Sequence, residues 1–377
     1  MIKYENIYVR LPLLEYVANL MYKTNLENIH IIACQHVLPS THLMLRSMFD
    51  LGLKPENCAV IGKCYSTSNL VIKHMRQEGI YVDNSSNYFD SHLSFDEQFQ
   101  HNIHHFLREQ ITRMNLGKND KVIIMDDGGE LLLAANNLLS EYSNIYGVEQ
   151  TSSGYNKLKN KELHFPVMNV ARSKAKLNIE SPMIIESSLN QLTNHLNELK
   201  LFPTTCLIVG NGILGSCLSK SLSLKYKVKC YDTITTLSDL EPTELNLSDY
   251  DLIIGTTGEV AISSSIYHLL KKGVILASIS SSDREFDAVH LRKLLQPTNN
   301  CHNNVIVNNM YLLNSGFPIN FYATEKDNIP LHNIQLTFAL LLAGVCQVLN
   351  NDNLGFVRLE ESLQNNITKK YIKLNNR

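Results

Sequence analysis

Six residues, Gly210-Asn211-Gly212-Ile213-Leu214-Gly215, constrain the fold of this 377-residue chain more than any other feature. The apolar run Cys206–Val209 precedes them, and a helical apolar pattern follows from Leu214 to Leu224. In a strand-turn-helix, the first glycine permits the tight turn, the second lets a pyrophosphate approach the backbone, and the third lets helix and strand pack closely. The free N–H groups at the start of the helix then face the phosphates. The pattern predicts a Rossmann-type domain that binds a dinucleotide.

Asp232 indicates which dinucleotide is bound. It stands 22 residues after Gly210, at the end of the next predicted strand, Lys227–Cys230. A carboxylate there accepts hydrogen bonds from the adenosine ribose and repels a 2'-phosphate, so the sequence favours NAD over NADP. A Thr-Thr-Gly turn after another buried strand is a further expected contact. The predicted cofactor contacts so far are Gly210, Gly212, Ile213, Leu214, Gly215, Asp232, Thr256, Thr257 and Gly258.

Short apolar runs alternate with helical patterns along the chain, which is typical of parallel sheets built from βαβ units. The expected strands are Ile29–Cys34, Cys58–Ile61, Lys121–Met125, Cys206–Val209, Lys227–Cys230, Leu252–Ile254 and Val274–Ile279, with helices between them, such as Ser264–Lys271. The predicted fold class is α/β, with two doubly wound parallel-sheet domains, the second a Rossmann domain. We expect a substrate-binding domain over 1–190 that includes a return helix over 331–349, an NAD-binding domain over 191–330, and a polar surface tail over 350–377.

Composition excludes several classes of protein. The net charge of -2 gives no positive field that would attract nucleic acid. No apolar run reaches the roughly 18 residues of a membrane span, and the longest candidate, Leu336–Leu349, is interpreted as a buried helix. Eight cysteines without a C-x-x-C pair indicate a reduced, cytoplasmic protein. His101, His104 and His105 have helical spacing but lack an acidic or thiol partner, so we expect a solvated helix face and no metal site.

The chain resembles the S-adenosyl-L-homocysteine hydrolase family from about Ile31 to about Leu349, with its motifs in the same order. The motifs that carry the resemblance are Cys34-Gln35-His36, Tyr65-Ser66-Thr67, Met125-Asp126-Asp127-Gly128-Gly129-Glu130-Leu131, Glu149-Gln150-Thr151-Ser152-Ser153-Gly154, Pro166-Val167-Met168-Asn169-Val170, Ser173-Lys174-Ala175-Lys176, Asp283-Arg284-Glu285-Phe286-Asp287 and Leu313-Asn314-Ser315-Gly316.

The resemblance implies that bound NAD oxidises a ribose 3'-hydroxyl, which acidifies the C4' proton and allows elimination of a thiol and addition of water. It implies that Lys174 is the base, that Asp127 holds the ribose hydroxyls and that His36 lies near C5'. The implied partners are a small-molecule nucleoside and further copies of the chain in a homo-oligomer. Further cofactor contacts are implied for Thr151, Ser152, Ser153, Ile279, Ser281 and Asn314.

Several substrate-side positions depart from the family pattern. Leu38 and Ser40 replace a threonine and a glutamate that grip adenine, Gln150 replaces a ribose-binding glutamate, and Asn178 replaces an aspartate. These four positions are the expected substrate contacts. The departures leave two alternatives open: an NAD-dependent oxidoreductase or hydrolase of another nucleoside or secondary alcohol, and a non-catalytic nucleotide-binding relative.

Overall fold

A computed structural model describes residues 10–321 and 326–376, and contacts between residues divide the chain into two compact units. Unit 1 comprises the described residues of 1–87, 99–180 and 324–377. Unit 2 comprises 88–98 and 181–323. The larger segment of the second unit therefore begins at Ser181 and not at 191, because residue 191 lies inside a helix that runs from Ser181 to Leu199.

Unit 1 contains a seven-stranded sheet in which all pairings are parallel. Its strands, in spatial order, are β13 (Gly355–Arg358), β6 (Pro166–Asn169), β5 (Asn144–Glu149), β4 (Lys121–Asp126), β1 (Ile29–Cys34), β2 (Cys58–Ile61) and β3 (Tyr81–Val82). Strands β1, β2 and β4 are buried along almost their whole length, as expected for apolar strands covered on both faces. The chain reverses its direction of progress across the sheet between β1 and β4, which makes this the topological switch point.

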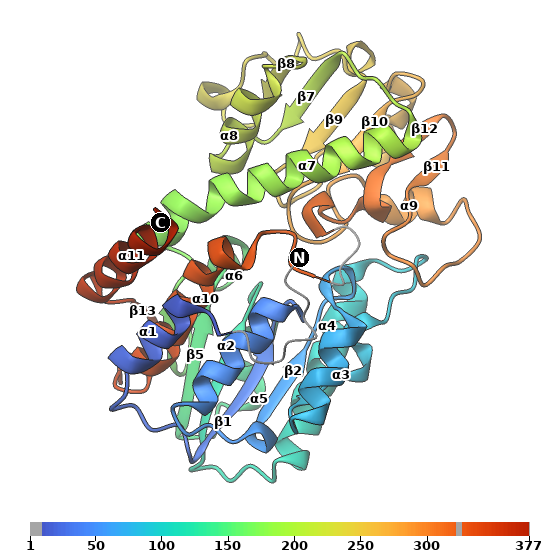
Figure 1. The fold of residues 1–377 in the computed structure, drawn as a ribbon. Helices are drawn as coiled ribbons and strands as arrows, with labels where there is room; N and C mark the ends of the chain where they lie inside the picture. The colour runs from blue at the N-terminus through green and yellow to red at the C-terminus, as the bar shows by residue number, and fades with distance from the viewer. Residues whose placement is uncertain (1–9, 322–325, 377) are drawn as a thin grey trace. The chain divides into compact units, whose positions relative to one another are not determined.

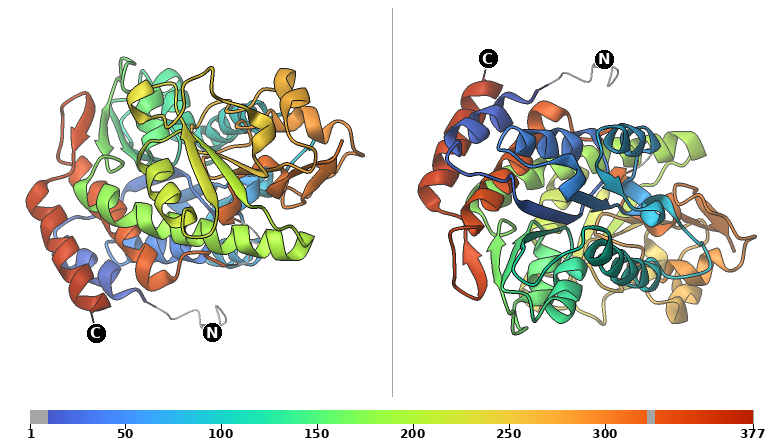
Figure 2. Two further views of the ribbon diagram at one scale, coloured as in Figure 1. Left: turned by 90° about the horizontal axis from the view of Figure 1, so that it is seen from above. Right: turned by 90° about the horizontal axis from the view of Figure 1, so that it is seen from below.

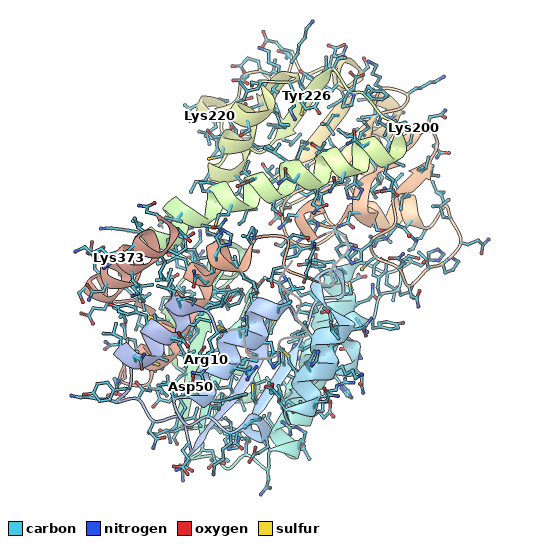
Figure 3. The ribbon with its side chains drawn as sticks, viewed as in Figure 1. Arg10, Asp50, Lys200, Lys220, Tyr226 and Lys373 are labelled. Atoms are coloured by element: carbon cyan, nitrogen blue, oxygen red, sulfur yellow. The ribbon has the colours of Figure 1, made fainter. Side chains whose placement is uncertain are left out.

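Helices cover both faces of this sheet (Figures 1 and 2), with α2 and α10 packed together on one face and α5 on the other. The helices of unit 1 are α1 (Pro12–Leu20), α2 (Pro39–Phe49), α3 (Asn69–Gln77), α4 (Phe95–Arg113, whose first residues belong to unit 2), α5 (Glu130–Leu138), α6 (Ser152–Leu158), α10 (Leu331–Val348) and α11 (Glu361–Asn375). By length and composition α10 qualifies as a membrane span, but 72% of it is buried, which is typical of a core helix. Arg10, just before α1, forms an ion pair with Asp50 at the end of α2, with 3.1 Å between Nη1 and Oδ2 (Figure 3).

The prediction of a surface tail over 350–377 is wrong. Strand β13 pairs in parallel with β6 and extends the sheet, and α11 packs against α1 and α10. Leu363, Ile367 and Tyr371 recur every four residues on α11 and are buried. This narrow apolar stripe was obscured by the polar residues around it, because a stripe of one residue per turn hardly alters the composition.

Unit 2 contains a six-stranded sheet, parallel except for the edge strand β11, with a second switch point between β7 and β9. Its strands, in spatial order, are β11 (Val305–Val307), β12 (Met310–Leu312), β10 (Ile275–Ser278), β9 (Leu252–Gly255), β7 (Thr205–Val209) and β8 (Lys227–Tyr231). Its α-helices are α7 (Ser181–Leu199), α8 (Ile213–Leu222) and α9 (Ala288–Arg292). The fold class of two doubly wound α/β sheets is confirmed by both units.

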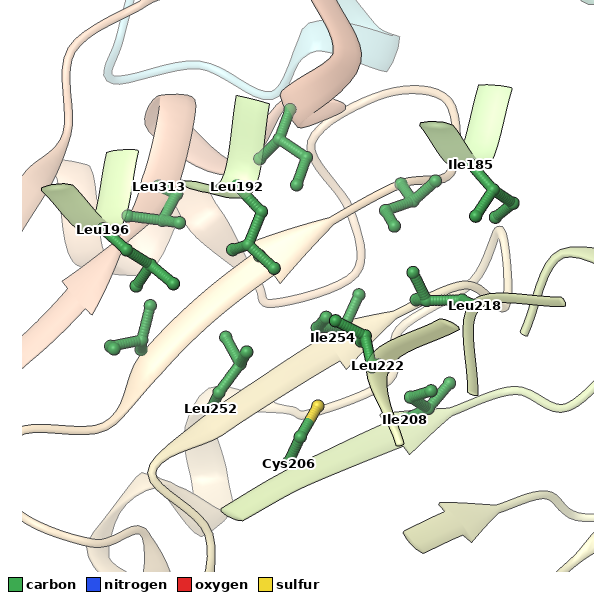
Figure 4. Packing of buried hydrophobic residues seen from close by; sticks show 14 of the residues in the cluster. Ile185, Leu192, Leu196, Cys206, Ile208, Leu218, Leu222, Leu252, Ile254 and Leu313 are labelled. Atoms are coloured by element: carbon green, nitrogen blue, oxygen red, sulfur yellow. The ribbon is translucent and has the colours of Figure 1, made fainter. Parts of the chain in front are cut away.

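One face of the unit 2 sheet carries a core formed with α7 and α8 (Figure 4). Ile185, Leu192 and Leu196 of α7 lie in the same cluster as Ile208 of β7 and Leu218 of α8. The helix predicted over 264–271 is instead a 3-10 helix, η7, over Ser264–Leu269. Its start was correctly assigned to a serine cap, since Ser263 accepts the N–H of Ser265.

Candidate functional site

The switch point of unit 2 brings together two backbone turns that follow neighbouring strands. Gly210 follows β7, and Thr256 follows β9. The Thr256 hydroxyl donates to the Gly210 carbonyl at 2.6 Å, and its backbone N–H donates to Val209 at 2.9 Å. Because parallel α/β sheets bind ligands outside the carboxyl ends of the strands at this point, the two turns form a candidate dinucleotide site.

Each glycine of the fingerprint meets a different physical demand. Gly210 has φ +95°, which disfavours any residue with a Cβ. A Cβ on Gly215 would lie 2.0 Å from the Gly210 carbonyl oxygen, so only glycine lets α8 approach the turn. A Cβ on Gly212 would meet nothing within 4 Å, which leaves open space above the backbone at the N-cap of α8. The three roles fit a pyrophosphate against the start of α8.

Asp232 lies just beyond β8 and is held against the same turn. Its Oδ2 accepts the N–H of Asn211 at 2.7 Å, and its Oδ1 accepts the N–H of Ile234 at 2.9 Å. Ile213, in the first turn of α8, remains 55% exposed. The exposed backbone N–H groups at the start of α8 can donate to a pyrophosphate, and the fixed carboxylate of Asp232 can accept from an adenosine ribose.

A buried carboxylate that sequence reasoning did not assign organises the Thr256-Thr257-Gly258 turn. Glu285 is fully buried and accepts the N–H of Gly258 at 2.7 Å and the hydroxyl of Thr257 at 2.8 Å. It also accepts the Ser280 hydroxyl. Burial raises the pKa of Glu285, although these donors partly offset the rise. Glu285 belongs to the segment Asp283–Asp287 that carries part of the resemblance, but nothing in the sequence indicated what it contacts.

The remaining cofactor contacts predicted for unit 2 have different environments. Ile279 is buried in the core cluster below β10. Ser281 is half-buried after that strand. Asn314 is fully buried with φ 50°, its amide donates to the Pro318 carbonyl at 3.0 Å, and its Oδ1 lies 3.1 Å from Nδ1 of His302. The side chain of Asn314 therefore acts within unit 2.

The switch point of unit 1 gathers a polar cluster around Asp127. His36 follows β1 and Asp127 follows β4, and His36 Nε2 lies 3.4 Å from Asp127 Oδ2. Gln150, which follows β5, donates to the same Oδ2. Three of the predicted site residues are thus brought together at the carboxyl edge of one sheet.

Sequence reasoning missed Lys63 and Ser66, which belong to this cluster. Lys63 follows β2, and its Nζ donates to Asp127 Oδ1. Ser66 Oγ lies 2.5 Å from His36 Nδ1. Burial opposes ionisation of both members of the ion pair, but their mutual attraction outweighs it, so the pKa of Lys63 is raised and the pKa of Asp127 is lowered. The rule that selected His36 and Asp127, a polar residue just after a buried strand, applies equally to Lys63.

Two further acids lie beneath the cluster as neighbours on β4 and β5. Asp126 and Glu149 are fully buried and stand opposite each other in the parallel register. Burial raises the pKa of Asp126 to about 6 and raises that of Glu149 well above its usual range. Glu149 accepts the N–H and hydroxyl of Thr151, each at 2.7 Å. Thr151 also caps α6, whose first residues, Ser152 and Ser153, are exposed.

The structure does not bring Lys174 into this cluster. Its Nζ lies 2.6 Å from Glu361 of α11, and its side chain is 77% exposed. The partner was not anticipated because residues beyond 350 were interpreted as a tail. Lys176, two residues later, is the less exposed lysine and lies 3.1 Å from Glu180. The side chain of Asn178 lies outside the described residues.

Leu38 and Ser40, which replace the adenine-binding residues of the family pattern, are both buried at the start of α2. Leu38 is the N-cap residue and is 5% exposed. The Ser40 N–H donates to Asp327 Oδ2 at 3.0 Å, and its hydroxyl donates to Asp327 Oδ1. Ser40 is therefore engaged by a carboxylate from the segment before α10. Within residues 10–321 and 326–376, no group of three or more His, Cys, Asp or Glu side chains has the arrangement of a metal site.

No family model matches the chain. It is 43% identical over 331 residues to uncharacterized proteins of two Mycobacterium tuberculosis strains, CDC 1551 / Oshkosh and H37Rv, covering 85% of this chain and 64% of each protein. It is 23% identical over 294 residues to an adenosylhomocysteinase of Acinetobacter baylyi, covering 70% of this chain and 60% of that enzyme. The chain thus spans just under two thirds of the curated relatives it matches.

Among solved structures, the chain is similar to a dipicolinate synthase chain from Bacillus halodurans, with a TM-score of 0.47, 11% identity, and coverage of 87% of this chain and 99% of the other. It is also similar to an NAD-dependent formate dehydrogenase from Staphylococcus aureus in complex with NAD, with a TM-score of 0.32, 12% identity, and coverage of 67% and 73%.

Proposed function

We propose that this protein is an NAD-dependent enzyme of the S-adenosyl-L-homocysteine hydrolase type, which acts on a ribosyl hydroxyl and cleaves or forms a 5'-thioether or a related nucleoside bond. One observation carries the cofactor assignment: the close approach of Gly215 to Gly210 beside the open backbone of Gly212. This cradle would hold the pyrophosphate of NAD, and Asp232 would hold its adenosine ribose. NAD, when bound, supplies a hydride acceptor for a secondary alcohol.

The residues of unit 1 supply the substrate side of the proposal. Asp127 remains ionised beside Lys63, so it is an acceptor for substrate hydroxyls and not a proton donor. His36 faces Asp127 and Ser66 and is the group in this cluster suited to proton transfer. Gln150 donates to Asp127 and retains a carbonyl oxygen that can accept from a hydroxyl.

The similarity to an adenosylhomocysteinase supports this proposal over that of a simple dehydrogenase. The test begins with purified protein that is denatured and assayed for released dinucleotide, where we expect NAD and not NADP. Adenosine and S-adenosylhomocysteine are then added to the native protein, and reduction of bound NAD is followed by absorbance. Absence of NAD from the protein, together with no NAD binding by calorimetry, would contradict the cofactor assignment.

A second candidate is an NAD-dependent oxidoreductase or hydrolase of another nucleoside or secondary alcohol. The observation that favours it is the apolar side chain of Leu38, buried at the start of α2, because it offers no hydrogen-bonding group to the amine of adenine. Reduction of bound NAD by a ribosyl compound without an adenine base, with no release of homocysteine from S-adenosylhomocysteine, would support this candidate. If no tested ligand reduces bound NAD, the remaining alternative is that the protein is a non-catalytic nucleotide-binding relative.

A further inference from the structure

We propose that Lys63 contacts the reacting hydroxyl of the substrate and stabilises the negative charge that develops on its oxygen, a role distinct from that of the base, which the resemblance gives to Lys174. The inference rests on the proposed function, because it takes the substrate of unit 1 to be a hydroxyl compound. It names a catalytic residue that the sequence did not indicate.

Lys63 is placed as a ligand-binding lysine would be. It lies two residues beyond the end of β2, at the edge of the sheet where His36 and Asp127 also lie. Its side chain is only 5% exposed. An ammonium group has three N–H donors, and among the described residues only one hydrogen bond from Nζ is found, to Asp127. Two donors are therefore available at a buried position.

Two buried glutamines at strand ends of the same sheet also have unused hydrogen-bonding capacity. Gln35, at the end of β1, is 1% exposed, and neither its amide nitrogen nor its carbonyl oxygen has a partner among the described residues. The carbonyl oxygen of Gln150 is likewise unpartnered there. Buried polar groups are nearly always satisfied, by protein, water or ligand. Unpaired donors and acceptors on three neighbouring strand ends therefore suit a polar molecule with several hydroxyl groups.

The charge on Lys63 suits an oxygen that becomes negative. A hydroxyl beside Nζ accepts from the ammonium, while Asp127 Oδ1 remains within reach as an acceptor. Loss of the hydroxyl proton then leaves the electron pair on an oxygen that faces a fixed positive charge at a buried site, where such interactions are strongest. The carboxylate of Asp127 keeps Lys63 protonated, so this lysine acts through its charge and not as a base.

His36 is the final acceptor for that proton. Because the Asp127 carboxylate only accepts, Nε2 carries the hydrogen that faces Oδ2 at 3.4 Å, and Nδ1 accepts the Ser66 hydroxyl hydrogen at 2.5 Å. The step is a proton relay: the substrate O–H bond breaks and its oxygen keeps the electron pair, Ser66 Oγ gains that proton, and the proton of the Ser66 hydroxyl passes to His36 Nδ1. The imidazolium formed then pairs with Asp127. Tyr65 and Cys34 also interact electrostatically with Lys63, and burial raises the pKa of each, so both stay neutral. The buried carboxyl of Asp126 is a further neighbour, and its pKa is raised by burial to about 6.

The test compares two ligands that differ by one oxygen. Adenosine is compared with its 3'-deoxy analogue, and methyl β-D-ribofuranoside is compared with its 3-deoxy analogue. Calorimetry measures the dissociation constant of each compound from the NAD-loaded full chain. In the wild type we expect the hydroxyl compound to bind at least about tenfold more tightly than its deoxy analogue. In Lys63→Met we expect this preference to disappear, with NAD content unchanged and reduction of bound NAD slowed at least about a hundredfold.

Lys118→Met is the matched control, because Lys118 forms an exposed ion pair with Glu141 in the same unit. If Lys63→Met does not stay folded under the assay conditions, Lys63→Arg replaces it. This variant keeps the positive charge beside Asp127 but moves the N–H donors, so we expect it to weaken the preference for the hydroxyl compound over its deoxy analogue. A preference for the hydroxyl compound that is unchanged in the Lys63 variant would overturn the assignment. If the wild type binds NAD but none of the ribosyl compounds, the proposed substrate class is wrong, and the role of Lys63 is rejected with it.

Discussion

The carboxylate of Glu285 accepts the backbone N–H of Gly258 from 2.7 Å away, and so fixes the turn that faces the start of α8. We expect Glu285→Gln to weaken NAD binding at least about tenfold. Both carboxylate oxygens now accept hydrogen bonds from N–H or hydroxyl donors, and the NH₂ group of glutamine cannot accept them. Each lost hydrogen bond costs roughly 1 to 3 kcal/mol. Calorimetric titration with NAD measures this. Glu241→Gln, at an exposed position, is the control, and equal affinities in the two variants would contradict the role.

Two glycine variants separate packing from ligand approach. Gly215→Ala places a Cβ 2.0 Å from the Gly210 carbonyl oxygen, so we expect a lower melting temperature even without cofactor. Gly212→Ala meets open space, so we expect an unchanged melting temperature but a loss of NAD affinity, because its Cβ projects where the pyrophosphate would approach. Melting curves with and without NAD distinguish them. Full NAD affinity in Gly212→Ala would argue against a pyrophosphate at this turn.

Arg292 is the buried centre of a network in unit 2. Its guanidinium lies 2.6 Å from Asp283, with both side chains 2% exposed, and it donates to the carbonyls of Ser91, Leu93 and Ser315. We expect Arg292→Met to destabilise unit 2 by about 3 to 5 kcal/mol, because it leaves a buried carboxylate unpaired. Denaturant titration measures this. Arg284→Met breaks a more exposed pair with Asp96 and should cost less than about 1 kcal/mol.

The double variant Arg292→Met/Asp283→Asn tests the cause. If the unpaired charge dominates, the double variant is more stable than Arg292→Met alone. If the lost bonds to the three carbonyls dominate, removal of the charge restores nothing, and the two variants unfold at the same denaturant concentration.

His195 of α7 gives unit 2 a defined sensitivity to acid. The side chain is fully buried, and burial lowers its pKa to about 4. The unfolded state then binds more protons than the folded state between pH 4 and the ordinary value near 6.5, so stability falls as the pH falls through this window, by up to about 3 kcal/mol. His195→Leu should flatten the pH dependence of the denaturant midpoint between pH 6.5 and 4.5. The exposed His268→Gln should leave the slope as in the wild type.

The sequence predicted the central strands of both sheets because buried parallel strands are short and wholly apolar, as β1, β2 and β7 are. Short edge elements could not be found in this way. Strand β3 has two residues, and β13 and α11 lie in a polar region where only their alternating or four-residue pattern distinguishes them. The unit boundary was misplaced because the predicted position, 191, falls in the middle of α7, which begins at Ser181.

For the candidate site, the sequence identified residues that stand directly after strands but could not identify their partners. His36, Asp127 and Gln150 meet as expected from their strand ends. Lys63 was missed although it satisfies the same rule, because the resemblance rests on the motif that follows it and not on the lysine itself. Lys174 and its ion-pair partner Glu361 are 187 residues apart in the sequence. Ser40 and its hydrogen-bond partner Asp327 are 287 residues apart. No local sequence pattern reveals contacts at such separations.

Unit 2 interrupts unit 1 twice, over 88–98 and over 181–323, and this has a consequence for how the chain is made. Its central helix α10 begins at Leu331, after every strand of unit 2. During synthesis from the N-terminus, unit 2 can complete its core while the sheet of unit 1 still lacks a helix that covers β5 and β6. A nascent chain released before residue 331 should therefore expose apolar strands and recruit chaperones. A fragment that begins at Ser181 and ends before Tyr322 contains all six strands of the unit 2 sheet and, of the described residues of that unit, lacks only the 88–98 segment.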